Sequence, residues 1–173
     1  LISYFFFNNA VICVFVFASM FASFLFGLKE SQILFLGIFI NLFGIVGCLT
    51  LGWIEDKVGS EKIVKLCIVS LMILTLILFF TKTKTIFWII ALIIGFFVGP
   101  IQASSRSVLV KKISSKNQLS AFLLFSIFGN ICAILGPFLV GIVIDISTSI
   151  RLGLLVIPTF FFISLLPYIL RYR

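Results

Sequence analysis

The chain is poor in the residues that a water-soluble protein needs on its surface. Only 10% of its 173 residues are charged, whereas a soluble domain carries roughly 25%. Hydrophobic residues make up 62% of the sequence, and its mean hydropathy is +1.37. So few charged side chains could not cover a water-facing surface, which excludes a soluble globular domain.

Groups that carry out chemistry are equally scarce. The sequence has no histidine, no Cys-x-x-Cys pair, no phosphate-binding glycine loop and no nucleophile–base pair. Its four cysteines fall inside apolar segments, where a thiol packs as a small hydrophobe; they are Cys13, Cys48, Cys67 and Cys132. We therefore expect no enzyme, no metal site and no cofactor. The basic residues form no patch with aromatic ones, so no nucleic-acid partner is expected either.

Long apolar runs fill the sequence instead. Six nearly uncharged stretches cover about 2–28, 32–54, 63–81, 85–105, 118–144 and 152–170. A helix needs roughly 20 apolar residues to cross the hydrocarbon core of a membrane. A spanning barrel would instead show strands of alternating polarity, and no alternation is seen. The sequence predicts an all-α bundle of six transmembrane helices that forms one domain, 1–173.

The basic residues predict how this bundle lies in the membrane. Nine of the 13 fall in the second and fourth gaps between helices and in the carboxy-terminal tail, and four fall in the other gaps. Cytoplasmic loops carry the excess of Lys and Arg. The second loop, the fourth loop and the carboxy terminus should therefore lie in the cytoplasm. We expect a bacterial plasma (inner) membrane, with the lipid bilayer as the first partner.

Two of the predicted helices carry a repeated pattern. Residues 39–56 and 128–145 are identical at six of eighteen positions when aligned at an offset of 89. The informative matches are Asn41 with Asn130, Gly47 with Gly136, Gly52 with Gly141 and Asp56 with Asp145. These helices run in opposite directions. Helices one to three and four to six are therefore predicted to form a 3+3 inverted repeat.

Two segments stand out as motifs. In Gly52–Lys62, Gly52 would let a neighbouring helix approach closely, Asp56 could pair with a helix amino terminus, and Gly59 would permit a tight reversal. The alternative is a plain solvated turn. In Gly99–Ser107, Gln102, Ser105 and Arg106 bring polar groups to the end of an apolar helix. Arg106 is as well explained as a topology anchor as it is by contact with a substrate.

The first motif resembles the Gly-x-x-x-Asp-Arg-x-Gly loop of the major facilitator superfamily, with Lys57 in the arginine position. Together, residues 4–9, 52–57, 99–107, 135–137 and 151–153 resemble its vacuole-effluxer-like branch, which includes autophagy-related amino-acid exporters. The resemblance spans nearly the whole chain and matches the last six helices of that branch. Two positions depart from it: Asn9 is often aspartate there, and Asn130 is often lysine.

The resemblance implies roles for individual residues. The candidates for the substrate path are Tyr4, Asn8, Asn9, Gln102, Ser105 and Arg106. The gating loop would consist of Gly52, Asp56, Lys57 and Gly59, with Asp56 latching to a helix that this chain does not contain. Helix packing and a kink in the fifth helix are expected from Asn41, Asn130, Gly136 and Pro137. Interhelical hydrogen bonding is the alternative role for the four asparagines.

These features predict the carboxy-terminal half of a secondary transporter that moves a small molecule by alternating access. The chain begins with Leu1 inside an apolar run, so we expect that an amino-terminal half is missing. The partner would be that half or a second six-helix unit. The alternative is a truncated or non-transporting six-helix membrane fragment or scaffold.

Overall fold

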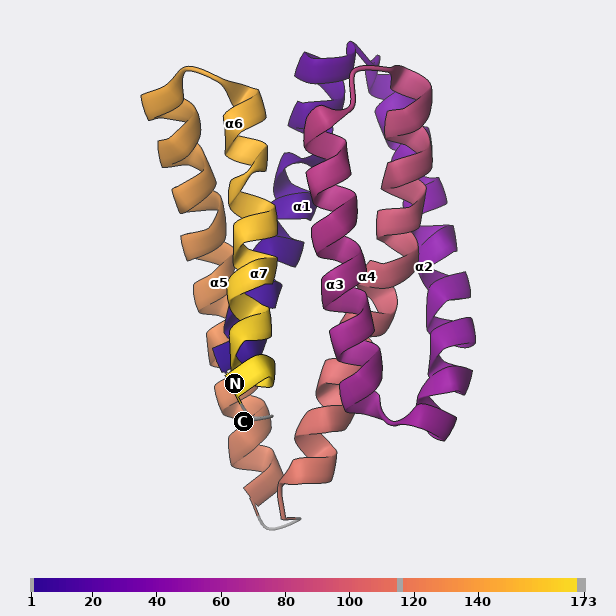
Figure 1. Cartoon of the computed structure of the whole chain (residues 1–173), viewed down its shortest axis with the longest axis vertical. Helices are drawn as coiled ribbons and strands as arrows, with labels where there is room; N and C mark the ends of the chain where they lie inside the picture. Colours follow the sequence, from indigo (N-terminus) through magenta and orange to yellow (C-terminus); the bar gives the residue numbers. More distant parts are fainter. Residues whose placement is uncertain (1, 115–116, 171–173) are drawn as a thin grey trace.

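The computed structural model describes residues 2–114 and 117–170, and helices account for nearly all of them (Figure 1). No strand occurs in these residues. The helices are α1 (Ile2–Phe26), α2 (Glu30–Val58), α3 (Ser60–Phe80), α4 (Lys84–Lys112), α5 (Gln118–Ser147), α6 (Ile150–Leu154) and α7 (Val156–Leu170). Helices α6 and α7 together form the sixth span, which is interrupted at Leu155. The prediction of six membrane-spanning helices is confirmed.

Two helices run further than their apolar segments. Helix α2 ends at Val58 rather than near 54, and α4 ends at Lys112 rather than near 105. Hydropathy detects only the part of a helix that lies in lipid, whereas Glu, Lys and Arg continue a helix readily in water. Asp56 and Lys57 therefore lie in the last turns of α2 and not in a loop. The connection to α3 is the single residue Gly59, whose positive φ of 93° suits glycine.

The helix contacts obey the predicted inverted repeat. Exchanging the first span with the fourth, the second with the fifth and the third with the sixth turns the α2–α4 contact into α1–α5. The same exchange turns α3–α4 into α1–α7 and leaves α3–α7 unchanged. These five pairs are the most extensive contacts of the bundle. The fold is therefore a 3+3 arrangement of six spans, as in half of a major facilitator protein.

The repeat-matched glycines lie at equivalent helix crossings. A Cβ on Gly47 of α2 would overlap the carbonyl of Phe96 in α4. A Cβ on Gly136 of α5 would lie 3.1 Å from the carbonyl oxygen of Asn9 in α1. Both glycines thus allow two helices to approach closely. The pair Gly52 and Gly141 has no atom of another part of the chain within 4 Å, so the close approach expected at Gly52 does not occur within this unit.

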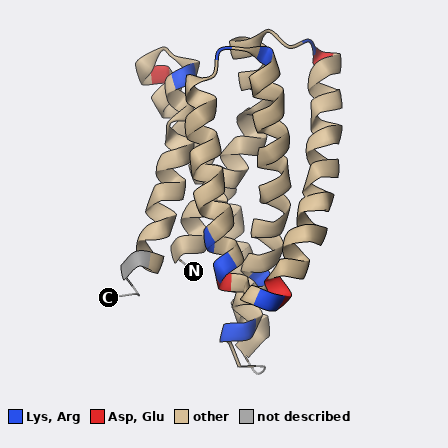
Figure 2. Cartoon of the chain, turned by 45° about the vertical axis from the view of Figure 1, so that its right-hand side comes forward, with Lys and Arg blue, Asp and Glu red and all other residues tan. Residues whose placement is uncertain are grey.

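Charged residues gather at the two ends of the bundle, and an uncharged band separates them (Figure 2). We call the end at which α2 passes into α3 the Gly59 end, and the opposite end, where α1 passes into α2, the Gly27 end. Basic side chains hold loop carbonyls at the Gly27 end. Lys84 Nζ donates to the Gly27 carbonyl at 3.1 Å, and Arg151 Nη2 donates to the Thr81 carbonyl at 3.1 Å. The α1–α2 and α3–α4 turns are thereby fixed to neighbouring parts of the bundle.

Candidate functional site

A pocket of about 500 Å³ opens at the Gly59 end, between the start of α1 and the end of α4. We call it the Tyr4 pocket. Its polar lining comes from three helices, α1, α4 and α7, and comprises Ser3, Tyr4, Ser105, Lys112 and Tyr168. Phe7, Val64 and Phe125 are among the apolar residues beside them. A mainly apolar concave site with a few convergent polar groups is what small molecules bind.

Aromatic packing and short hydrogen bonds fix the polar groups of the pocket. The ring of Tyr4 stacks on Phe125 of α5, with centroids 3.6 Å apart and planes inclined by 24°. Ser3 Oγ donates to the Ser164 carbonyl at 2.7 Å, and Ser105 Oγ donates to the Gln102 carbonyl at 2.8 Å. The structure thus brings together Tyr4 and Ser105, two of the predicted substrate-path residues. Arg106 follows Ser105 with an exposed side chain.

Asn8 and Asn9 were expected to share a path with Tyr4, but neither lines the Tyr4 pocket, although the Asn8 amide and the Tyr4 hydroxyl both approach Gly129 of α5. Both asparagine side chains are buried on α1. Asn9 Nδ2 donates to the Phe5 carbonyl at 2.8 Å and to Cys132 Sγ of α5 at 3.0 Å. Its Oδ1 is buried and has no hydrogen-bond partner among the described residues. The face of α1 that carries Asn9 packs on α5, because Gly136 leaves room for it.

Gln102 lines a second, separate opening. This groove of about 430 Å³ runs between α2 and α4, and Asn41, Cys48 and Gly99 also line it. We call it the Asn41 groove. Asn41 was expected to join helices, but its side chain is exposed, and Nδ2 donates to the Gly37 carbonyl of its own helix at 2.8 Å. The two neutral amides can therefore offer hydrogen bonds to whatever fills the groove.

Asn130, the repeat partner of Asn41, also fails to join helices. Its side chain on α5 is exposed and makes no hydrogen bond to any described residue. Pro137 lies inside α5, and the helix continues through it to Ser147. Gly136 is a true packing position, as its contact with α1 shows. Sequence reasoning identified these polar and small residues but could not tell which face of the helix each one occupies.

The residues of the predicted gating loop face away from this six-helix unit. Gly52 has open space around it, and Asp56 is exposed, with no hydrogen bond or ion pair to the described part of the chain. Lys57 Nζ lies 3.6 Å from the centre of the Trp53 ring, and both side chains are exposed. Their orientation leaves the motif available to another protein unit.

Of the two adjacent acidic residues in the last turn of α2, Glu55 is the one that bonds to neighbouring helices, and sequence reasoning missed it. Its carboxylate accepts hydrogen bonds from Ser60 Oγ at 2.6 Å and from Ser104 Oγ. Lys111 Nζ in turn donates to Ser60 Oγ at 2.8 Å. Glu55 precedes the motif aspartate and belongs to no signature. The sequence shows two adjacent carboxylates, Glu55 and Asp56, at the end of an apolar helix. It does not reveal which of the two side chains turns toward the other helices.

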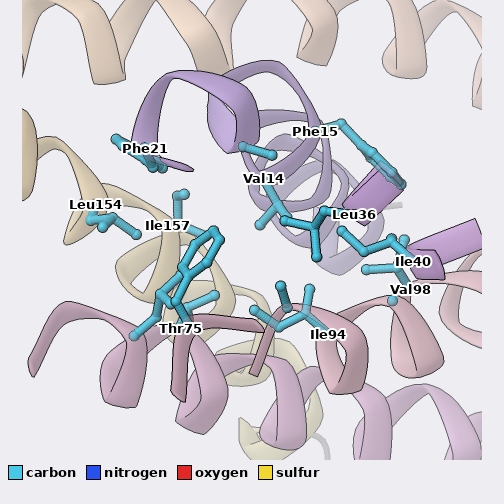
Figure 3. Close-up of a pocket in the computed structure, with 15 residues that line it drawn as sticks. Val14, Phe15, Phe21, Leu36, Ile40, Thr75, Ile94, Val98, Leu154 and Ile157 are labelled. Atoms are coloured by element: carbon cyan, nitrogen blue, oxygen red, sulfur yellow. The ribbon is translucent and has the colours of Figure 1, made fainter. Parts of the chain in front are cut away.

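A third cavity, of about 60 Å³, lies in the apolar interior (Figure 3). Thr75 is the one polar residue that lines it, and the Thr75 hydroxyl is already bonded to the Leu71 carbonyl at 2.8 Å. A cavity without free polar groups cannot orient a polar solute. Among the described residues, no three His, Cys, Asp or Glu side chains converge to hold a metal ion. The Tyr4 pocket and the Asn41 groove remain the candidate binding surfaces.

Comparisons with known proteins agree with this architecture. A family profile described as "Vacuole effluxer Atg22 like" matches residues 1–172. The chain is 25% identical over 147 residues to an uncharacterized MFS-type transporter, YxiO, of Bacillus subtilis (strain 168). That match covers 85% of this chain and 34% of the relative, so the chain spans about a third of its length. No solved structure matches. Since the profile covers nearly every residue, this integral membrane chain belongs to the vacuole effluxer Atg22-like family, a branch of the major facilitator transporters.

Proposed function

We propose that this chain is the carboxy-terminal unit of a secondary active transporter, which moves a small solute by alternating access. The observation that carries the proposal is the exposure of Asn41 and Asn130 near the middle of α2 and α5. Asn41 bonds only to the Gly37 carbonyl of its own helix, and Asn130 bonds to no described residue. An amide atom that hydrocarbon leaves without a hydrogen-bond partner costs roughly 2–7 kcal/mol. These positions are therefore expected to face protein or water rather than lipid.

A second six-helix unit would supply that environment. The relative is about three times as long as the matched region, which leaves room for such a unit. Two units that rock about a central site are the usual design of these transporters. The outward-facing Gly52 and Asp56 would then meet the partner unit at the Gly59 end. That unit is an amino-terminal half of the same protein or a second copy of this chain.

The charges support one orientation. Five lysines lie at the end of α2, the start of α3 and the end of α4, which is the Gly59 end: Lys57, Lys62, Lys65, Lys111 and Lys112. Figure 2 shows basic residues gathered at this end. Because cytoplasmic segments carry more Lys and Arg, we place the Gly59 end and the carboxy terminus in the cytoplasm. The family resemblance suggests that the membrane is a bacterial plasma membrane. The Tyr4 pocket would then open toward the cytoplasm, and small organic solutes, including amino acids, are the substrates that the resemblance suggests.

Flux measurements on the full-length protein test the proposal. The protein would be reconstituted in liposomes, and uptake of radiolabelled small solutes would be compared with and without a proton or sodium gradient. Gradient-driven accumulation of a solute supports secondary transport. Absence of flux for every solute, by a protein that is folded and correctly inserted, would favour the non-transporting scaffold.

The gating role of Asp56 has its own test. Asp56→Asn removes a charge that contributes roughly 1 kcal/mol when it faces a helix terminus, so flux should fall about fivefold while insertion and stability stay unchanged. Asp145→Asn is the matched control, because Asp145 is the repeat partner at the opposite end of the bundle. Equal flux in Asp56→Asn and the parent protein would contradict the latch.

A further inference from the structure

A brace centred on one carboxylate joins three helices at the Gly59 end. Glu55, in the last turn of α2, accepts hydrogen bonds from Ser60 at the start of α3 and from Ser104 of α4. Lys111, two turns further along α4, donates to the same Ser60 hydroxyl at 2.8 Å. The final stretch of α4 is thus held at two points, directly where Ser104 bonds to Glu55 and indirectly where Lys111 bonds to Ser60.

The two points that the brace holds adjoin two residues of the Tyr4 pocket. Ser104 precedes Ser105, and Lys111 precedes Lys112; Ser105 and Lys112 both line the pocket. Neighbouring residues of a helix point about 100° apart, so one residue of each pair can face the brace while the other faces the pocket. Lys112 is also paired with Glu61 of α3. The α4 wall of the pocket therefore keeps its place through bonds that Ser104, Lys111 and Lys112 make with α2 and α3.

We propose that Glu55 is a positioning residue, which fixes the α4 wall of the Tyr4 pocket without touching whatever binds there. The proposal concerns the shape of the pocket, and its importance for transport rests on the function proposed above. The charge matters because hydrogen bonds to an ionised carboxylate are roughly twice as strong as neutral ones. Asp56, the adjacent carboxylate, cannot replace Glu55, because it points away from the bundle.

The other charges around the brace are already engaged. Glu61 of α3 forms an ion pair with Lys112, and Lys57 of α2 lies over the Trp53 ring. Lys111 bonds to Ser60. When Glu55 loses its charge, Glu61 cannot accept hydrogen bonds from the serines around Glu55 without leaving Lys112, and Asp56 points away from them. The end of α4 should then separate from α2 and α3 more often, and Ser105 should become accessible.

Thiol labelling of the full-length protein tests this directly. Ser105, 7% exposed, is changed to cysteine in a Cys48→Ala background, because Cys13, Cys67 and Cys132 are fully buried. A water-soluble maleimide then reports how often the pocket wall opens. Adding Glu55→Gln should raise the labelling rate on the order of tenfold, which corresponds to about 1.4 kcal/mol. Glu30→Gln, at the other end of α2, should leave the labelling rate unchanged.

Variants of the partner residue separate positioning from general loss of structure. Ser104→Ala removes the donor from α4 and should raise the labelling rate as Glu55→Gln does, whereas Ser104→Thr keeps the hydroxyl and should retain the parent rate. The double variant Glu55→Gln with Ser104→Ala should label more slowly than the product of the two single effects predicts, because both changes affect the bond between Glu55 and Ser104. Unchanged labelling in Glu55→Gln, or additive effects in the double variant, would overturn the proposal.

Transport supplies a second readout where a substrate is known. If Glu55 only positions the pocket wall, Glu55→Gln should raise the KM for uptake several-fold and lower the maximal rate by a smaller factor. A fall in the maximal rate with KM unchanged would contradict a positioning role. The labelling result does not depend on transport. A protein that transports nothing but shows the expected labelling therefore refutes the proposed function and retains the brace.

Discussion

The inverted repeat makes two helix crossings equivalent, α2 on α4 and α1 on α5. The atoms that make the contact differ between them. Glycines bring backbone against backbone where α2 crosses α4. A Cβ on Gly95 would lie 2.7 Å from the Ile40 carbonyl oxygen, and one on Gly99 would lie 2.8 Å from the Gly44 carbonyl oxygen. At the α1–α5 crossing, Gly129 and Gly136 of α5 approach mainly side chains of α1, and the side chains of Asn9 and Cys132 fill the remaining space.

This difference shows that a repeat conserves the place of a helix crossing but not its chemistry. Backbone packing leaves no freedom, because carbonyl groups cannot move without moving the helix. Side-chain packing can adjust, because the Asn9 amide and the Cys13 and Cys132 thiols can change rotamer. The buried Asn9 Oδ1 without a partner also marks the α1–α5 crossing as imperfectly satisfied. We therefore expect the α1–α5 crossing to be the more adaptable of the two.

The largest effect should come from Gly47→Ala. The new methyl group would overlap the Phe96 carbonyl, so α2 and α4 must separate, and overpacking of this kind costs about 2 kcal/mol. Reversible unfolding of the full-length protein in mixed micelles measures the loss. Gly37→Ala on the same helix is the control, since nothing lies within 4 Å of Gly37; it should gain up to about 1 kcal/mol from helix propensity. Equal stability of the two variants would contradict the tight crossing.

A smaller loss is expected for Gly136→Ala, the equivalent change at the other crossing. The added Cβ would meet Cys13 Sγ at 2.8 Å and Asn9 Oδ1 at 3.0 Å. These two side-chain atoms can rotate away. The Asn9 carbonyl oxygen, at 3.1 Å, is much less crowded than the Phe96 carbonyl oxygen at 1.9 Å from a Cβ on Gly47. The cost should therefore be about 1 kcal/mol, at the lower end for overpacking. The same unfolding measurement gives the value. A loss larger than that of Gly47→Ala would reverse the proposed difference between the crossings.

The smallest effect should come from Cys132→Ala, which removes the hydrogen-bond partner of Asn9 Nδ2. A hydrogen bond between membrane helices contributes about 0.6 kcal/mol on average, and Cys132→Ala should lose about that much free energy of unfolding. Cys132→Ser keeps a polar acceptor and should remain within that range of the parent protein. A loss above 2 kcal/mol in Cys132→Ala would show that the α1–α5 crossing depends on this contact more than its geometry suggests.

Some of the candidate site could be predicted from the sequence, and some could not. Tyr4 and Ser105 were expected on one path and do line one pocket, although 101 residues separate them along the chain. Gln102 was assigned to the same path and lies in another groove. Three positions along a helix turn a side chain by about 300°, so the step from Gln102 to Ser105 is enough to change the helix face that each residue occupies.

The role of Glu55 also could not be predicted from the sequence. The motif directed attention to Asp56, yet the carboxylate that braces α3 and α4 is the residue before it. Both acids fit the end of a membrane helix equally well, because both can reach water there. Only the positions of Ser60 and Ser104, which come from two other helices, distinguish them. A pattern within one helix contains no information about the neighbour that its two carboxylates will meet.

The sequence by itself determined the lipid environment, the six spans, the inverted repeat and the family. These follow from hydropathy and spacing along a single chain, because each spanning helix satisfies its own backbone hydrogen bonds. The tertiary structure decided which polar side chains are buried, which face a pocket and which are exposed on the outside of the bundle. Those outcomes depend on the rotation of each helix about its axis, and the packing of all six spans fixes that rotation together.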